Sequence, residues 1–134
     1  MKISELLTES VGKSQYRTGM CDAFAIALHN ITQLPLGAWT GFYYDDFEEE
    51  DVPETCHVCC VKSFEKLEWI DVVGVHKGIP KNCHFSNPVE SIKLLPITRE
   101  EARYVFTMEG VTEEEIKTAE ILILSDSNFK WVQG

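Results

Sequence analysis

Apolar residues recur at intervals of three and four positions after Cys21, and this spacing predicts a helix with one buried face. The apolar positions on that face are Ala23, Phe24, Ala27, Leu28 and Ile31. Pro35 and Gly37 follow, so we expect the helix to end between residues 30 and 33. Cys21 therefore stands in the first turn, where free backbone N–H groups and the helix dipole favour a thiolate.

The rest of the N-terminal two thirds predicts one short helix and several strands. Residues 2–11 show the pattern of an amphipathic helix, and a polar loop connects them to the helix of Cys21. The strands are predicted from β-branched and aromatic residues, and they cover residues 38–44, 55–63, 67–74 and 91–97. The second and third strands are separated by a short turn, so we expect an antiparallel hairpin. We expect loops over the acidic residues 45–54 and over residues 75–90.

Two capping boxes predict helices near the C-terminus. They are Thr98 with Glu101 and Thr112 with Glu115. We expect the first helix to end near Glu109 and the second near Leu124, although the apolar run 121–124 is also compatible with a strand. The order of helices, then a small antiparallel sheet, then helices predicts a single α+β domain over residues 1–134.

The net charge of the chain limits the classes of molecule that it is expected to bind. Twelve Lys and Arg residues against 22 Asp and Glu residues give a net charge of −10. Such a surface repels phosphates, so we expect neither nucleic acid nor an anionic membrane as a partner. No apolar run is long enough to span a bilayer, and the first residues do not resemble a signal peptide, so we expect a cytoplasmic protein. A protein or peptide substrate, neutral or basic, fits this charge, and the sequence indicates no oligomeric state.

Five cysteines are an odd number in a chain without a recognisable export signal, so we expect free thiols rather than a disulfide framework. Most free cysteines are small buried hydrophobes, and position alone favours that role for Cys21. A thiol becomes a nucleophile when a base takes its proton and a third group orients the base. The chemistry of Cys21 therefore depends on its neighbours.

His57 and Asp71 supply the missing partners. The predicted hairpin places them nearly opposite each other, and cross-strand neighbours approach within about 5.5 Å. Asp71 stands between Ile70 and Val72, and burying a carboxylate there is costly unless a group such as an imidazole pairs with it. We therefore predict a catalytic triad of Cys21, His57 and Asp71.

The segment around Cys21 resembles the nucleophile segment of papain-like cysteine peptidases. The shared features are Gln15 six positions before the cysteine, Gly19 two positions before it, and Ala23-Phe24 after it. His57 at the start of one strand and Asp71 in the next are similar to the transglutaminase-like branch of this superfamily. The short interval from Cys to His also suits the compact NlpC/P60-like peptidases. The resemblance covers about residues 15–74 and implies a papain-like core, with the nucleophile at the N-terminus of a central helix that packs on a small antiparallel sheet.

Three residues depart from the papain pattern. Thr18 stands where papain-type enzymes have a disulfide cysteine, Asp22 replaces the aromatic residue that follows their nucleophile, and Asp71 replaces an asparagine. Asp22 is a like charge beside a thiolate and would oppose its formation. These departures leave the substrate and the direction of the reaction open.

The resemblance implies an oxyanion hole made by the Gln15 side chain and the Cys21 backbone N–H. As substrate-binding residues we expect Trp39 and Tyr43, together with Cys59, which lies on the same face of its strand as His57. We therefore expect a thiol-dependent hydrolase or acyltransferase that acts on peptide, isopeptide or glutamine side-chain amides. Peptidase, amidase, deamidase and transglutaminase activities share the thioester intermediate, and the triad does not choose among them.

Two alternatives without catalysis remain. A zinc site would use the thiols and imidazoles at Cys56, Cys59, Cys60, Cys83 and His84. Cys56 and Cys59 fall on opposite faces of the predicted strand and have no glycine turn between them, so we expect no metal and no cofactor. The other alternative, suggested by the net charge of −10, is an acidic protein-interaction module, such as an inhibitor or adaptor whose acidic face mimics nucleic acid.

Overall fold

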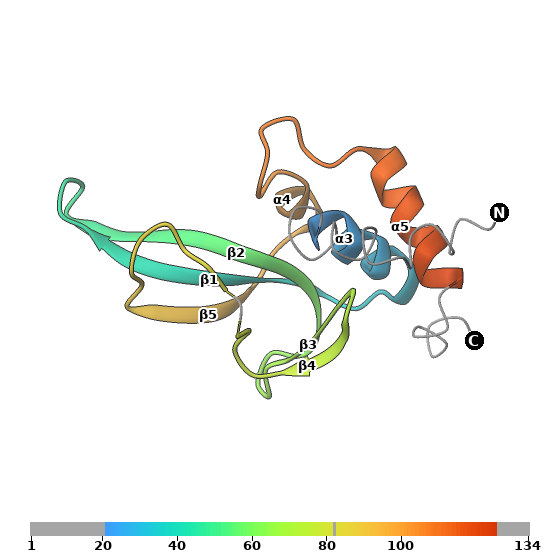
Figure 1. The fold of residues 1–134 in the computed structure, drawn as a ribbon, viewed down its shortest axis with the longest axis horizontal. Coiled ribbons are helices and arrows are strands. Elements are labelled where there is room, and N and C mark those ends of the chain that lie inside the picture. Colours follow the sequence, from blue (N-terminus) through green and yellow to red (C-terminus); the bar gives the residue numbers. More distant parts are fainter. Residues whose placement is uncertain (1–20, 82, 126–134) are drawn as a thin grey trace.

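A computed structural model describes residues 21–81 and 83–125 of the chain, so the helix expected over residues 2–11 and the oxyanion candidate Gln15 lie outside the described residues. The described elements in chain order are α3 (Cys21–Thr32), β1 (Leu36–Asp45), β2 (Glu50–Ser63), β3 (Glu68–Asp71), β4 (Gly74–Lys77), β5 (Ser91–Pro96), α4 (Arg99–Arg103) and α5 (Glu113–Ser125). The strands form one antiparallel five-stranded sheet in the order β4-β3-β2-β1-β5 (Figure 1). The predicted α+β class is confirmed.

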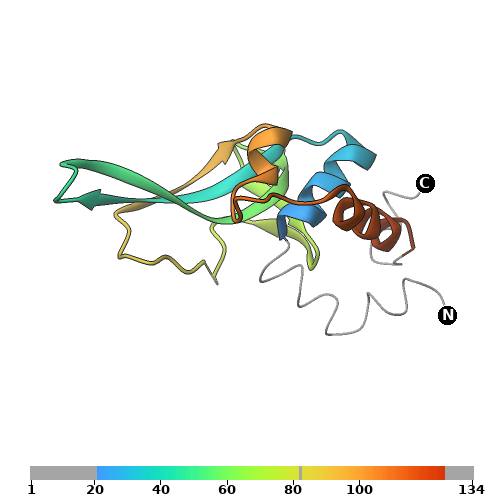
Figure 2. The same cartoon turned by 90° about the horizontal axis from the view of Figure 1, so that it is seen from above.

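The helices gather at one end of the sheet, while the β1–β2 hairpin extends away from them (Figures 1 and 2). Helix α3 lies between the sheet and α5, and its residues from Ala23 to Leu28 are at most 1% exposed. This helix is thus buried on every side over its central turns rather than on one face. A second, smaller cluster comprises Trp39, Cys59, Val61, Trp69 and Leu94.

Local signals placed most helix boundaries correctly. Helix α3 ends at Thr32, within the predicted range, and the following residue has a positive φ of 65°. Both capping boxes form, with reciprocal bonds of 2.9 to 3.1 Å between the Thr and Glu of each pair. Residues 121–124 are helical, because Leu122 and Ile123 are fully buried while their neighbours on either side are exposed.

The first C-terminal helix is shorter than expected. Helix α4 ends at Arg103 instead of near Glu109, because the chain folds back there. The backbone N–H of Val111 donates to the Arg103 carbonyl at 2.9 Å, and the Arg103 guanidinium donates to the Val111 carbonyl. Met108, which a longer helix would have carried, is 99% exposed. No helix among the described residues is long and apolar enough to cross a membrane.

Two predicted loops are partly strands. The acidic run 45–54 was expected to be a loop, but β1 continues to Asp45 and pairs with Glu50 at the start of β2. The backbone ladder tolerates these residues because the tip is exposed and their charges stay in water. In the expected loop 75–90, β4 pairs with β3 after a tight turn at Gly74, whose φ of 141° suits glycine.

One disulfide contradicts the expectation that all thiols are free. Cys56 and Cys83 are linked, with their Cα atoms 5.8 Å apart. The long connection between β4 and β5 passes over the sheet, where Phe85 and Val89 pack against Gly41, and brings Cys83 to β2. This path depends on tertiary contacts that the spacing of cysteines does not reveal. Cys21, Cys59 and Cys60 are free and buried.

The packing of α5 predicts a large difference between two neighbouring leucines. Leu122 is 0% exposed and Leu124 is 51% exposed, so the same truncation probes core and surface in one helix. We expect Leu122→Ala to lower the free energy of unfolding by about 2–5 kcal/mol, and Leu124→Ala by less than about 1 kcal/mol. Urea unfolding followed by circular dichroism measures both values. Equal losses would contradict this packing of α5.

Candidate active site

Helix α3 places Cys21 at its first residue, where the thiol is 6% exposed. The Cys21 side chain lies close enough to the His57 imidazole to raise its pKa. Backbone N–H groups in the first turn of a helix have no intrahelical acceptor, so they stabilise negative charge at this position. The Cys21 thiol thus lies near a base, the His57 imidazole, and at the positive end of the helix dipole, which favours the thiolate.

Strand β2 carries His57, and the register of the sheet brings Asp71 to it. His57 pairs with Trp39, but Thr55 pairs with Thr40, so Cys56 is the extra residue of a β-bulge. On the other side of β2, Cys60 pairs with Ile70, which sets Asp71 beside Cys59 and diagonal to His57. The expected pairing of 57 with 71 is therefore offset by two residues. The side chains still meet, with His57 Nε2 3.3 Å from Asp71 Oδ2.

The pKa values reflect this arrangement. Burial lowers the pKa of His57, but the hydrogen bond to Asp71 and the neighbouring Cys21 side chain outweigh it and raise the pKa to about 9. Burial raises the pKa of Asp71, but hydrogen bonds from His57 and His76 outweigh burial and lower the pKa below its usual range. An imidazolium beside an ionised carboxylate is therefore favoured at neutral pH. Since the Nε2 atom faces Asp71, Nδ1 is the ring nitrogen left for Cys21.

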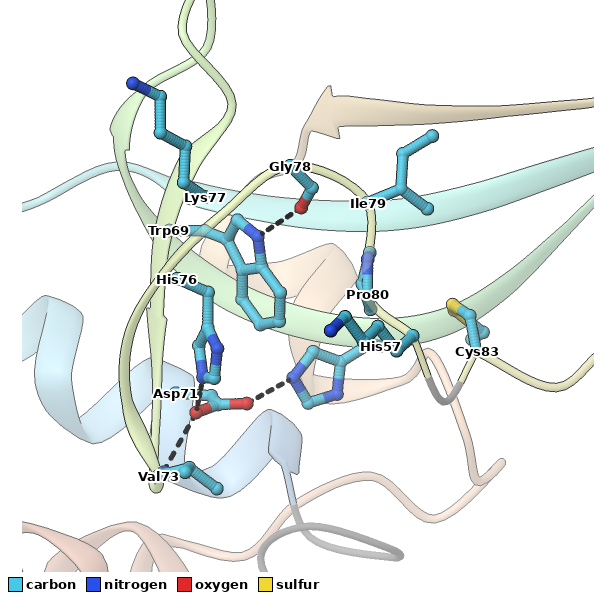
Figure 3. A pocket seen from close by; sticks show the side chains of 12 residues that line it. His57, Trp69, Asp71, Val73, His76, Lys77, Gly78, Ile79, Pro80 and Cys83 are labelled. Atoms are coloured by element: carbon cyan, nitrogen blue, oxygen red, sulfur yellow. Dashed lines mark hydrogen bonds and ion pairs between the residues drawn. A yellow bond between two sulfur atoms is a disulfide. The ribbon is translucent and has the colours of Figure 1, made fainter.

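A second imidazole, absent from the predicted triad, also binds Asp71. His76 lies on β4 and its Nε2 atom is 2.7 Å from Asp71 Oδ1 (Figure 3). Its ring stacks on Trp69, the residue that it pairs with across β3 and β4, at 4.3 Å between centroids. The sequence signal was the four-residue turn ending at Gly74, which places His76 five positions after Asp71 on a returning strand. We had expected a loop there, so the pairing was missed.

The same residues line a pocket of about 550 Å³ beside His57 (Figure 3). Trp69 packs edge-on against His57, with ring centroids 5.4 Å apart, and its indole N–H donates to the Gly78 carbonyl at 2.8 Å. The other wall is formed by residues 78–81 and by Cys83, which the disulfide ties to β2. The pocket thus gives a ligand access to the His57 imidazole and the Asp71 carboxylate.

The expected substrate-binding residues lie elsewhere. Trp39 is 1% exposed and packs edge-on against Trp69, with ring centroids 6.0 Å apart. Cys59 is fully buried, and its Sγ donates to the Gly37 carbonyl at 3.8 Å. Tyr43 pairs with Val52 in the distal part of the β1–β2 hairpin and lies beside the hairpin tip. Trp39 and Cys59 are therefore core residues next to the site and are not open to a substrate. Tyr43 lies farther along β1, away from the site.

Asp22 follows the nucleophile and is itself buried at 4% exposed. Burial raises its pKa to about 6, against a hydrogen bond from the Ala23 backbone N–H, and the charge of Glu115 adds to the increase. Below about pH 6 Asp22 is therefore mostly neutral. Its opposition to the Cys21 thiolate is then weakest in mildly acidic solution.

The described residues contain no group of three His, Cys, Asp or Glu side chains arranged to hold a metal ion. Of the thiols in the zinc alternative, Cys56 is paired with Cys83, and Cys60 donates to the Ala25 carbonyl at 3.2 Å. The sulfur atoms of Cys56 and Cys60 are therefore not placed to bind one shared metal ion. The structure thus gives no support to the zinc alternative within the described part of the chain.

Comparison with known proteins gives no relative: no protein-family model matches the chain, and no curated protein or solved structure matches it at a significant level. The resemblance to papain-like peptidases accordingly stays a prediction.

The raised pKa of His57 predicts a pH-dependent contribution to stability. The folded-state pKa of about 9 exceeds the unfolded value near 6.5, so the folded protein binds the additional proton between these values. This stabilisation is complete below about pH 6.5 and is lost as pH rises through about 9. We expect the loss in unfolding free energy caused by His57→Gln to be larger at pH 6 than at pH 9.5, measured by urea unfolding.

His84→Gln is the matched control for this experiment, because His84 is exposed. We expect this variant to change the unfolding free energy little at either pH. A constant difference between wild type and His57→Gln across this range would contradict the ion pairs assigned to His57.

Proposed function

We propose that the chain is a thiol-dependent hydrolase or acyltransferase that acts on amide bonds, with Cys21 as the nucleophile. One observation carries the proposal: the His57 imidazole is 3.3 Å from the Asp71 carboxylate and lies close enough to the Cys21 side chain for that side chain to raise its pKa. These three groups come from three elements, α3, β2 and β3, and such a constellation is what nucleophilic catalysis by a thiol requires.

A papain-like core of the compact transglutaminase-like or NlpC/P60-like kind belongs to the same proposal. It is supported by a buried helix that starts at the candidate nucleophile and packs on an antiparallel sheet. The base and its carboxylate partner lie on neighbouring strands of that sheet. The motif around Cys21 agrees with the superfamily as a whole, while Asp71 and the short interval from Cys21 to His57 agree with this branch rather than with papain itself.

In the proposed reaction, His57 takes the proton of Cys21 and the thiolate attacks the amide carbonyl carbon. The backbone N–H of Cys21 and, by resemblance, the Gln15 side chain stabilise the oxyanion; removing one such donor typically costs about 10²–10³ in rate. The intermediate collapses to a thioester as His57 returns its proton to the leaving amine. Water or a second amine then attacks the thioester and restores the Cys21 thiol, with His57 again as the base.

The expected substrate is a protein or peptide. The pocket beside His57 offers Val73, Ile79 and Pro80 as apolar contacts for a side chain near the reacting amide. Of the described residues that line it, only Asp71 is acidic, and Asp71 is already paired with two imidazoles. A basic segment of the substrate would therefore meet the acidic tip of the β1–β2 hairpin rather than the pocket. The expected compartment stays the cytoplasm, but the Cys56–Cys83 disulfide does not support it, because reducing conditions there disfavour disulfides.

The triad predicts selective reactivity of Cys21. We expect iodoacetamide at pH 7 to alkylate Cys21 faster than a model thiol such as N-acetylcysteine, because only the thiolate reacts. Cys21→Ala should abolish this fast labelling. Mass spectrometry of the digested protein identifies the labelled cysteine, and a vinyl sulfone probe provides a second electrophile.

Cys59→Ala and Cys60→Ala are the matched controls. Both thiols are free and fully buried, and burial raises the pKa of each. Neither substitution should slow the labelling of Cys21. Labelling of Cys59 instead of Cys21, or a wild-type rate no higher than that of the model thiol, would refute the proposed function.

The role given to Asp71 yields a further prediction. Asp71→Asn keeps the size of the side chain but removes the charge that stabilises the His57 imidazolium. We expect the rate of Cys21 alkylation at pH 7 to fall by at least about tenfold, with the pH midpoint of labelling shifted upward. If Asp71→Asn folds and the pH profile of Cys21 alkylation is unchanged, Asp71 neither orients the His57 imidazole nor stabilises its protonated form.

A further inference from the structure

The carboxylate of Asp71 is divided between two histidines (Figure 3). Its Oδ1 atom accepts from His76 Nε2 at 2.7 Å and from the backbone N–H groups of Val73 and Gly74 at 2.9 and 3.3 Å. Among the described residues, its Oδ2 atom accepts from His57 alone, at the longer distance of 3.3 Å. The histidine outside the triad thus holds the carboxylate more tightly than the histidine inside it.

We propose that His76 is a positioning residue that shares the charge of Asp71 and thereby limits the basicity of His57. The inference rests on the proposed function, since it assigns a role to His76 in that reaction. Each donor to a carboxylate stabilises its negative charge and leaves less of it for the other donor. Without His76, Asp71 would act on His57 alone.

Strand pairing and ring stacking in the sheet fix the position of His76. Its ring is stacked on Trp69 with an interplanar angle of 22°, and Trp69 is anchored by the bond to Gly78. The His76 side chain is 32% exposed, while His57 and Asp71 are 13% and 12% exposed. His76 therefore connects the enclosed His57–Asp71 pair to the pocket surface.

Sharing the charge has a chemical benefit for the proposed reaction. His57 must accept a proton from Cys21 and then release it to the leaving amine. An imidazolium that is stabilised too strongly favours the thiolate but gives up its proton slowly. By reducing the charge available from Asp71, His76 keeps His57 able to do both steps.

In the part of the chain that the structure describes, few other charged groups lie around the two rings. Cys21 faces His57 from α3, and Asp71 faces both rings from β3. Cys59 is close on β2 but stays protonated because burial raises its pKa. Lys77 and Lys81 line the same pocket from β4 and from the segment after it, and neither pairs with Asp71 in the described residues. Asp71 is therefore the group through which His76 acts on His57.

Two substitutions separate the hydrogen bond from the packing. His76→Phe keeps an aromatic ring to stack on Trp69 but removes the donor to Asp71. His76→Gln keeps an amide donor and removes the ring. Histidine NMR titration gives the pKa of His57 directly, and the chain has only 4 histidines to assign.

We expect the pKa of His57 to rise by about one unit in His76→Phe and to stay close to wild type in His76→Gln. The pH midpoint of Cys21 alkylation should fall by a similar amount in His76→Phe, because a more basic His57 stabilises the thiolate. An unchanged or lower His57 pKa in His76→Phe would overturn the inference. A drop in thermal stability shared by both variants, with no pKa change, would assign His76 a structural role only.

The wild-type protein provides the deciding measurement if His76→Phe does not fold. Charge sharing requires the two imidazoles to be coupled, so the shifts of His57 should report the protonation of His76 as a second step. A single-step curve in that case would overturn the inference. If the pKa of His57 rises in His76→Phe but Cys21 is unreactive, charge sharing stands and the proposed function fails.

Discussion

The pairing of the Asp71 carboxylate is the constraint on which the site depends. A carboxylate that is 12% exposed is costly to keep ionised unless donors surround it, and Asp71 has two imidazoles and two backbone N–H groups. Those donors lie on β2, on β4 and in the turn between β3 and β4. The same contacts that keep Asp71 ionised therefore hold three strands and the His57 ring in place.

The distribution of charge separates the two ends of the molecule. Most of the acidic run 45–54 is exposed at the tip of the β1–β2 hairpin, far along the sheet from the helices (Figure 2). The site lies at the end of the molecule where α3 meets the sheet. There, the buried His57 imidazolium and Asp71 carboxylate largely neutralise each other. A chain of strongly negative net charge can thus keep a thiolate near a cation, because the acidic run 45–54 is remote and screened by water.

Sequence reasoning succeeded where structure is determined locally. The helix after Cys21, the β2–β3 hairpin and both capping boxes follow from spacing, turn residues and reciprocal side-chain bonds within a few positions. It failed where distant segments decide the outcome. The early end of α4 depends on contacts with Val111, and the disulfide depends on the path of the long β4–β5 connection. His76 was missed because β4 has only four residues and β3 supplies its pairing partner.

The three free cysteines show why neighbours, rather than burial, decide which thiol can react. Cys21, Cys59 and Cys60 are all buried, so exposure does not distinguish them. The thiols of Cys59 and Cys60 donate to main-chain carbonyls, and an acceptor of this kind stabilises the protonated form. The thiol of Cys21 faces an imidazole, which accepts the proton and leaves an ion pair at a helix N-terminus. The same side chain is thus inert in the core and a nucleophile candidate at the start of α3, and the difference lies in the group that receives its proton.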